Sequence, residues 1–356
     1  VIQAPIDADF AWIKFRNQAY SHSLYDTVRG NNTRLISNDT ATEGTVSFSF
    51  LDNKNIQISG ASDTSQNDNN EPLVGWFWKA GGNKNTFNVD NVGYSTYTTA
   101  PGLDEGALKI SGASVGTKQG FSIIKYVGNA TQPTTVPHGL NSALDFMIVK
   151  NLTTANNWAV FHKDLIDGGT VRYLRLNTTD GRVTGSGHFG NTAPTDTVFT
   201  LGSDDQVNKL NNDCIAYCWH SVPGFSKFGS FTTVNSSSEY VHLGFKPAIL
   251  WIKRTGGGST TNLTTYGSWY VNNSEMSPVN PASYEEVLWL NENYAEGKRG
   301  NGGGAGTYLN VDFLSDGFRM RGSANAEIGQ PNDINIYCAW AEAPSIDLYG
   351  GGANAR

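Results

Sequence analysis

The chain has 356 residues, a mass of 38.5 kDa and a net charge of −7 at neutral pH. Apolar residues make up 38% and charged residues 16%, while 40 residues are Gly and 12% are aromatic. This composition excludes a coiled coil and a disordered chain. The acidic balance argues against a nucleic-acid partner, which selects a basic face. No apolar run approaches the about 20 residues of a membrane-spanning helix, so we expect no membrane insertion.

Residues 1–80 form the first predicted β module. The module opens with AWIKFRN, which contains Lys14, and closes with GWFWKA, which contains Trp78. Between them lie LYD at Tyr25 and TRLISN, which ends at Asn38. Short alternating runs separated by Asn, Asp and Gly predict antiparallel strands with one buried face. Because no initiator Met or signal-peptide pattern is present, we expect this module to be incomplete at its N-terminus.

Residues 81–118 join the first module to the second. The run TFNVDNVGYSTYTTA alternates with a period of two around Asn91-Val92-Gly93. This pattern predicts a hairpin inside a decorated linker.

The markers of the first module return in the same order in residues 119–223 and 224–345. The second module contains Lys150, Trp158, Asn177 and Trp219, and the third contains Lys253, Trp269, Asn291 and Trp340. In each copy a Gly precedes the last Trp by 17 or 18 residues. The two later copies also share a prelude, GFSIIKYVGN and GFSKFGSFTTVN. Ordered markers in three copies predict an internal repeat.

We therefore predict an all-β fold of three related antiparallel modules, sandwich-like and stacked in tandem, with a polar C-terminal tail at 346–356. A closed propeller is disfavoured, because three blades are fewer than the usual four to eight. The run ASYEEVLWLNENYAEG (282–297) has a helical composition. Its repeat partners TRLISN and TVRYLRLN are β-like, so we predict a strand there.

The aromatic residues fall into two groups. Trp78, Trp219 and Trp340 recur in register, which indicates a structural core. Binding aromatics should instead lie in loops and differ between copies. The residues that meet this criterion, and so are candidates for stacking against a sugar ring, are Tyr94, Tyr97, Tyr266 and Tyr308. The alternative for these tyrosines is a position in exposed turns without a ligand.

The three cysteines are predicted to be reduced and buried. Cys214 and Cys218 lie four residues apart in a strand-like run, so their Cα atoms are about 13 Å apart. A disulfide needs less than about 7 Å. With Cys338 the chain has three cysteines, so at least one thiol cannot form a disulfide within the chain.

No catalytic motif is recognisable, so we expect neither an enzyme nor a cofactor. The six histidines are scattered. The carboxylates that could converge as a glycosidase pair are Asp164, Asp167, Glu285, Glu286, Asp312 and Asp316. The acidic loops before the repeated tryptophans hold Asp63, Asp68, Asp204, Asp205 and Asp213. Solvated turns are the preferred interpretation of these loops, and calcium binding is the alternative.

Several long strings resemble a module found in virion proteins of tailed bacteriophages, especially phages of cyanobacteria and other marine bacteria. The strings are WIKFRNQAYSHSLYDTVRG, GWFWKAGG, GFSIIKY with a later HGL at His138, AYCWHSVPGFSKFGS, FKPAILWIKR and DFLSDGFRMR. The similarity covers nearly the whole chain. It implies the C-terminal part of a tail-fibre-type protein, often preceded by a laminin-G/concanavalin-like domain, with no assigned catalytic residues.

The resemblance sets the functional expectation. It implies a virion protein that is assembled in the host cytoplasm, lies on the tail or outer surface, and contacts other virion proteins. A homo-oligomer is expected, with a trimer favoured. Its ligand would be a glycan of the bacterial surface. A capsid decoration or scaffold protein without a ligand, and a polysaccharide-degrading fibre, stay open as alternatives.

Overall fold

The computed structural model describes residues 1–51, 54–59, 71–234, 239–256, 267–276, 278, 280, 286–297, 310–321 and 332–342. The predicted all-β class is confirmed, because strands dominate and nearly all of them pair antiparallel. The short helical elements of the described residues are α1 (Ser186–Phe189), α2 (Asp205–Asn208), η1 (Tyr97–Thr99) and η2 (Lys163–Leu165). None of these helices has the length and apolar character that a membrane crossing requires.

The chain divides into two compact units. Unit 1 comprises Val1–Arg16, Tyr20–Asn177 and Val183–His220, and unit 2 comprises Asn17–Ala19, Thr178–Arg182 and Ser221–Arg356. We call residues 1–80, 119–223 and 224–345 copies 1, 2 and 3. The module boundaries stay a prediction, and the tail at 346–356 lies outside the described residues.

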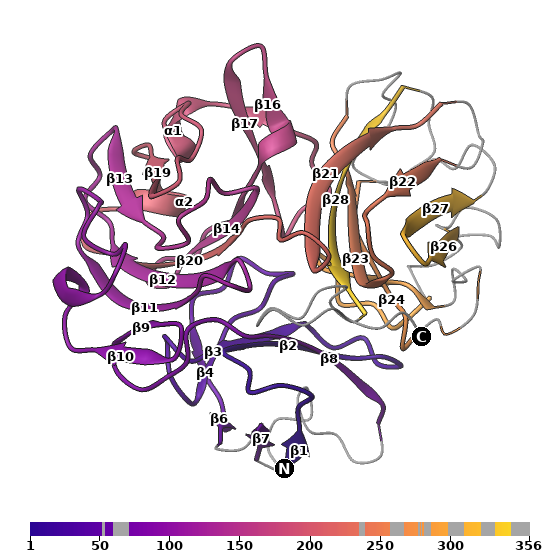
Figure 1. Cartoon of the computed structure of the whole chain (residues 1–356), viewed down its shortest axis with the longest axis horizontal. Coiled ribbons are helices and arrows are strands. Elements are labelled where there is room, and N and C mark those ends of the chain that lie inside the picture. Colours follow the sequence, from indigo (N-terminus) through magenta and orange to yellow (C-terminus); the bar gives the residue numbers. More distant parts are fainter. Residues whose placement is uncertain are drawn as a thin grey trace. The chain divides into compact units, whose positions relative to one another are not determined.

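Copy 1 forms small sheets within unit 1 (Figure 1). Its strands are β1 (Ile2–Gln3), β2 (Phe10–Phe15), β3 (Ser23–Asp26), β4 (Thr33–Arg34), β5 (Gly44–Thr45), β6 (Phe48–Phe50), β7 (Asn55–Ile58) and β8 (Leu73–Trp78). The sheet orders are β3-β2-β8, β1-β7-β6 and β4-β5. The central strand β2 is buried along its whole length.

A ten-stranded sheet is the largest sheet described in unit 1. Its main path runs β10-β9-β11-β12-β20-β14-β15-β17-β16, and β18 pairs with β17. Its strands are β9 (Phe87–Val89), β10 (Val92–Tyr94), β11 (Ile110–Gly116), β12 (Phe121–Val127), β14 (Phe146–Asn151), β15 (Ala159–His162), β16 (Ile166–Asp167), β17 (Thr170–Arg175), β18 (Val183–Thr184) and β20 (Asp213–Trp219). A separate pair is formed by β13 (Thr134–Pro137) and β19 (Val198–Leu201).

Residues 81–118 are more than the predicted linker, because they extend this sheet. The hairpin is present as β9 and β10, with its turn at Asp90-Asn91. Strand β11 then pairs parallel with β9 and antiparallel with β12. Phe87 and Val89 are buried in the main core of unit 1. The segment is therefore an integral edge of the sheet.

Unit 2 contains two sheets with the orders β21-β28-β23-β24-β25 and β22-β27-β26 (Figure 1). The strands are β21 (Ser226–Thr232), β22 (Tyr240–His242), β23 (Pro247–Arg254), β24 (Trp269–Asn273), β25 (Leu288–Trp289), β26 (Asn310–Leu314), β27 (Gly317–Arg321) and β28 (Ile334–Ala341). Of the predicted strand at 282–297 the structure describes residues 286–297, and within these Leu288–Trp289 forms the strand β25, which pairs with β24. Residues 282–285 lie outside the described part.

The repeated sequence markers occupy matching places in the sheets. We call the strand that contains the repeated Trp the Trp strand, and the strand that contains the repeated Lys the Lys strand. In copy 2 the strand of the shared prelude, the Trp strand, the Lys strand and the strand of the second marker lie side by side as β12-β20-β14-β15. In copy 3 the same order is β21-β28-β23-β24. Copy 1 shows the last three as β8-β2-β3. The tryptophans pair across to the Lys strand as Phe10↔Trp78, Phe146↔Trp219 and Ile249↔Trp340. All three tryptophans are buried.

One short helix replaces a predicted turn. Helix α2 lies in the acidic loop before Trp219. The Asp204 side chain accepts a hydrogen bond of 2.9 Å from the backbone N–H of Gln206, which satisfies one of the unpaired donors at the helix start. Asp204, one of the acidic residues assigned to a solvated turn, is thus the N-cap of α2.

The cysteines are free and buried. Burial raises the pKa of Cys214 to about 12 and also raises the pKa of Cys218. We therefore expect a thiol reagent at pH 8 to label none of the three cysteines in the native chain within minutes and all three after denaturation. Absorbance of the released reagent gives the count, and rapid native labelling would contradict the buried positions.

Candidate functional site

Two of the four candidate tyrosines lie on one segment of unit 1, β9 to η1 (Phe87–Thr99), which we call the tyrosine platform. Tyr94 ends β10 and pairs with Phe87 across the hairpin. Tyr97 belongs to η1, and its ring meets that of Phe87 edge to face at 6.1 Å. Both tyrosines are half-buried and pack on the core. Tyr266 and Tyr308 lie outside the described residues.

The turn residues dictate this hairpin. Asp90 and Asn91 both have positive φ, 48° and 66°. Asp and Asn tolerate this left-handed conformation better than most residues, and two such residues match the twist of a two-residue hairpin. Because β10 ends the sheet order, Tyr94 stands on its edge strand.

Hydroxyl groups accompany the Tyr97 ring. The Oγ1 atom of Thr96 lies 3.1 Å from that of Thr98 and 3.0 Å from that of Thr99. All three threonines are exposed. The platform therefore combines aromatic surface with hydroxyls that can both donate and accept hydrogen bonds.

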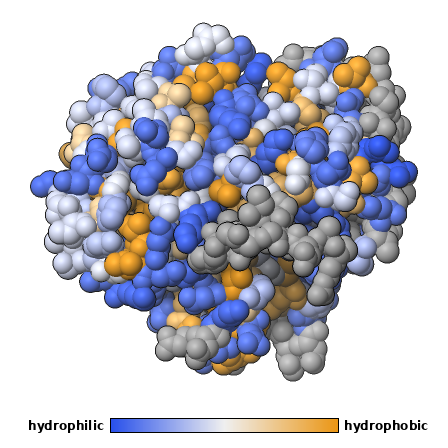
Figure 2. All heavy atoms as spheres, in the orientation of Figure 1, coloured by the Kyte–Doolittle hydropathy of each residue, from blue (hydrophilic) through white to orange (hydrophobic). Residues whose placement is uncertain are grey.

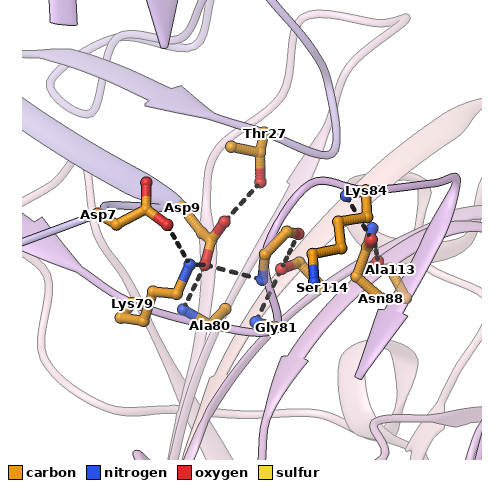
Figure 3. A network of polar contacts seen from close by, with 11 residues as sticks. Asp7, Asp9, Thr27, Lys79, Ala80, Gly81, Lys84, Asn88, Ala113 and Ser114 are labelled. Carbon is orange, nitrogen blue, oxygen red and sulfur yellow. Dashed lines mark hydrogen bonds and ion pairs between the residues drawn. The ribbon is translucent and has the colours of Figure 1, made fainter. Parts of the chain in front are cut away.

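A buried polar network fixes the start of this segment (Figure 3). Asp9 Oδ2 accepts hydrogen bonds from the backbone N–H groups of Ala80 at 2.8 Å and Gly82 at 3.0 Å. The Gly81 N–H donates to Ser114 Oγ, which donates in turn to the Gly82 carbonyl, both at 2.9 Å. A Cβ at Gly81 would lie 2.5 Å from backbone atoms of β9 and β11, so only glycine fits there.

Asn88 holds the next turn of the segment. Its Oδ1 accepts from the N–H groups of Lys84 at 2.7 Å and Asn85 at 2.9 Å. Its Nδ2 donates to the Ala113 carbonyl of β11 at 3.4 Å. Figure 3 shows Asn88 lying between the loop and the neighbouring strand. The base of the platform is thus tied to the sheet by side chains as well as by strand pairing.

Charge balances the Asp9 carboxylate in this network. Lys79 Nζ lies 3.2 Å from Asp9 and 3.0 Å from the exposed Asp7 (Figure 3). Burial raises the pKa of Asp9, while Lys79 and the two backbone donors act in the opposite direction. The role of Asp9 is therefore that of a paired structural anchor.

The candidate glycosidase carboxylates lie in both units. Asp164 and Asp167 belong to unit 1, whereas Glu286, Asp312 and Asp316 belong to unit 2, and Glu285 lies outside the described residues. Asp167 forms an ion pair with Arg172, and Asp312 with Arg321, each at 2.5 Å. The Asp167 and Asp312 carboxylates therefore each form an ion pair within their own hairpin. A hydrolytic pair of carboxylates stays an untested alternative.

In the acidic loop of copy 2 the carboxylates form local ion pairs. Asp205 pairs with Lys209 at 2.9 Å, and Asp213 pairs with Lys125 at 3.0 Å. Asp63 and Asp68 lie outside the described part of the chain. Among the residues that are described, no group of three or more His, Cys, Asp or Glu is placed to hold a metal ion.

Three buried lysines are a feature whose role the sequence analysis missed. Lys14, Lys150 and Lys253 occupy the same register on the Lys strands, opposite the residue four positions before the repeated Trp. Each is at most 1% exposed. The sequence feature that indicates such a role is a lysine within an otherwise apolar strand in every copy.

The ammonium groups bind backbone carbonyl oxygens. Lys150 Nζ donates to Thr40 at 2.9 Å and to Asn156 at 2.7 Å. Lys253 Nζ donates to Thr179 at 3.1 Å and also to Gly267. Thr40 and Thr179 each follow the repeated Asn of the preceding copy by two residues. We call this contact the lysine latch, since it joins one copy to the loop of the copy before it.

Two further contacts recur around the latch. The Lys150 ammonium lies 5.7 Å from the Trp158 ring centre, and that of Lys253 lies 5.8 Å from Trp269. The side chains of the repeated Asn38, Asn177 and Asn291 accept hydrogen bonds of 2.8 to 3.0 Å from a backbone N–H group at or directly before the start of β3, β15 and β24, respectively. Burial lowers the pKa of Lys150 to about 8.

A buried ionic cluster lies elsewhere in unit 1. Asp26 accepts from the Arg29 guanidinium and, at 2.8 Å, from the Tyr217 hydroxyl. Arg29 also contacts Glu43 at 3.1 Å and the Leu24 carbonyl at 2.9 Å. Burial opposes the charge of Arg29, but the neighbouring Asp26 raises its pKa above the ordinary value. The cluster links copy 1 with the Trp strand of copy 2.

These elements define a β-rich repeat protein whose copies are joined through buried polar contacts, with an aromatic platform at one sheet edge. The model of the family described as "Domain of unknown function (DUF7483)" matches residues 1–344. The chain belongs to this family. No curated protein and no solved structure matches the chain.

Proposed function

We propose that the chain is a structural protein of a phage virion, a tail-fibre segment that attaches to a bacterial surface glycan. The resemblance of its repeated strings to virion proteins of tailed phages supplies the setting. The tyrosine platform carries the binding part of the proposal, because it pairs Tyr94 and Tyr97 with exposed hydroxyls on an anchored hairpin.

The platform suits a saccharide chemically. The C–H face of a sugar ring packs against an aromatic ring, while its hydroxyls exchange hydrogen bonds with hydroxyls such as those of Thr96 and Thr98. Because the tyrosines already pack on the core, little side-chain freedom is lost on binding.

The face of the molecule seen in Figure 2 suits a protein that is exposed to solvent. In Figure 2 hydrophilic side chains cover much of the described surface seen from this side, with apolar residues scattered among them. Under this proposal the chain forms a homo-oligomer, a trimer by preference, beside other virion proteins.

Substituting the platform tyrosines tests the binding role. We expect Tyr97→Ala to weaken binding to host cells and to the glycans identified on an array by about tenfold, because a stacking ring is lost. Tyr94→Ala should act in the same direction. The matched control is Tyr20→Ala, which removes another half-buried tyrosine of unit 1 with an edge-to-face partner, Phe15 at 5.3 Å.

The outcomes separate the alternatives. Equal binding by all variants would refute the platform as the glycan site. Complete absence of glycan and cell binding by the wild-type chain would favour a scaffold or capsid decoration, and the position of the chain in virion images would then assign it to head or tail. Release of reducing sugars from host polysaccharide would instead establish the degrading fibre.

A further inference from the structure

A second aromatic surface lies in unit 2, on the hairpin of β22 and β27. Tyr240 is 44% exposed and is the only aromatic side chain among the large hydrophobic residues that the structure describes as exposed. It stands on β22, the edge strand of the order β22-β27-β26. An exposed ring on an edge strand is available to a ligand.

Strand register places charged groups on the same face as this ring. Tyr240 lies directly across from Arg319, and His242 follows Tyr240 by two residues. Because side chains alternate along a strand, these three share one face. The opposite face carries Val241 and Phe318, which pack in the core of unit 2. The packing of Val241 and Phe318 therefore fixes the position of the hairpin whose outer face carries Tyr240.

Polar contacts order the exposed side chains. The Tyr240 hydroxyl lies 3.3 Å from His242 Nδ1, which in turn lies 3.7 Å from Asp316 Oδ2. The Asp316 carbonyl accepts the N–H groups of Leu243 at 2.8 Å and Gly244 at 3.0 Å, which fixes the turn that carries it. A hydrogen bond to Asp316 raises the pKa of Tyr240.

Arg319 adds an available cation. Its side chain is exposed, and its guanidinium has no hydrogen-bond or ion-pair partner within the described residues. Its other cross-strand neighbour, Asp312, is paired with Arg321. Lys227 donates to the His242 carbonyl at 2.7 Å and brings a further positive charge to the edge. Arg319 is thus the cation that this face offers to an anionic ligand.

We propose that Tyr240, His242, Asp316 and Arg319 form a second saccharide-binding patch that takes an acidic sugar of the uronic acid class. The proposal rests on the glycan-binding function above and extends it to unit 2. Tyr240 stacks against the sugar ring, and the planar guanidinium of Arg319 binds the sugar carboxylate through two parallel hydrogen bonds. Asp316 and His242 accept hydrogen bonds from sugar hydroxyls.

Calorimetric titration of the full chain with oligoglucuronate, and with oligoglucose as the neutral probe, tests this patch. We expect binding of oligoglucuronate in preference to oligoglucose. Tyr240→Ala and Arg319→Gln should each weaken binding at least tenfold. Arg319→Lys should not restore it, because an ammonium lacks the planar fork. All three substitutions are at exposed positions, and circular dichroism verifies that the variants fold.

Each other result is decisive. Absence of oligoglucuronate binding at millimolar concentration overturns the patch, and so does binding that Tyr240→Ala leaves unchanged. Equal binding of the two probes overturns the acidic class. Binding that is lost in Tyr97→Ala but retained in Tyr240→Ala would preserve the proposed function while refuting this site. Oligoglucuronate binding that depends on Tyr240 but not on Tyr97 is the result expected of a separate patch in unit 2.

Discussion

Replacement of Lys150 by Met is expected to lower the free energy of unfolding of unit 1 by about 3 kcal/mol at neutral pH. Methionine retains most of the buried apolar stem but removes a donor from the Asn156 carbonyl and leaves the Thr40 carbonyl with only the backbone N–H of Asn156. Each hydrogen bond from a charged group contributes about 1.5–3 kcal/mol, and the relief of burying an ammonium offsets part of that loss. Urea denaturation followed by tryptophan fluorescence measures the difference.

Lys209→Met provides the control for this experiment. Lys209 is 38% exposed and pairs with Asp205 one helical turn away, so its loss should cost less than about 0.5 kcal/mol. Equal effects of the two substitutions would show that the lysine latch does not stabilise unit 1.

The same pair of proteins reports the ionisation of Lys150. Its pKa is lowered from 10.5 to about 8 in the folded chain, so between these values the unfolded chain binds more protons than the native one. Stability attributable to Lys150 therefore rises with pH in this window, by about 2 kcal/mol between pH 8 and 9.5. The neutral amine keeps two N–H donors for its two carbonyl partners. The gap between wild type and Lys150→Met should widen at pH 9.5, and a narrowing gap would contradict the shift.

Asp26→Asn is the second substitution with a large expected effect, a loss of about 3–5 kcal/mol in the free energy of unfolding. Asp26 is fully buried, and the Arg29 side chain is only 1% exposed. Removing the carboxylate charge leaves the buried guanidinium with Glu43, which is 30% exposed, as its ion-pair partner. The Tyr217 hydroxyl keeps only a neutral acceptor. Denaturation curves measure the loss.

Two further variants separate charge from packing. Asp167→Asn removes a carboxylate that is 54% exposed and should cost less than about 1 kcal/mol. The double substitution Asp26→Asn with Arg29→Met should recover part of the loss, since it no longer buries an unbalanced cation. A double variant as unstable as the sum of its single changes would argue against coupling between Asp26 and Arg29.

The sequence predicts the fold best where residues alternate along a strand and recur in each copy. The repeated tryptophans illustrate this, because Trp78 and Trp219 both lie opposite a Phe on the Lys strand. The segment 81–118 was harder, since a local pattern reveals the β9–β10 hairpin but not the pairing of β11 with strands on both sides. Such long-range pairing leaves no mark in a short window of sequence.

The candidate site shows the same division. Tyr94 and Tyr97 could be selected because they stand outside the repeat, but the Asp9 network beneath them joins residues about 70 positions apart. Tyr240 was overlooked because binding aromatics were sought in loops, whereas its exposure comes from an edge strand. The lysines were visible as markers, yet their acceptors are main-chain oxygens, which any residue type supplies.

That last property has an evolutionary consequence. When the acceptor of a hydrogen bond is a backbone oxygen, only the donor, here the lysine, must keep its residue type. Mutation can change Thr40 or Thr179 to almost any residue without removing the oxygen that the ammonium binds. Duplicated copies can therefore drift in their connecting loops while keeping the same junction, and chimaeras that exchange copies between related chains should join correctly as long as each retains its lysine.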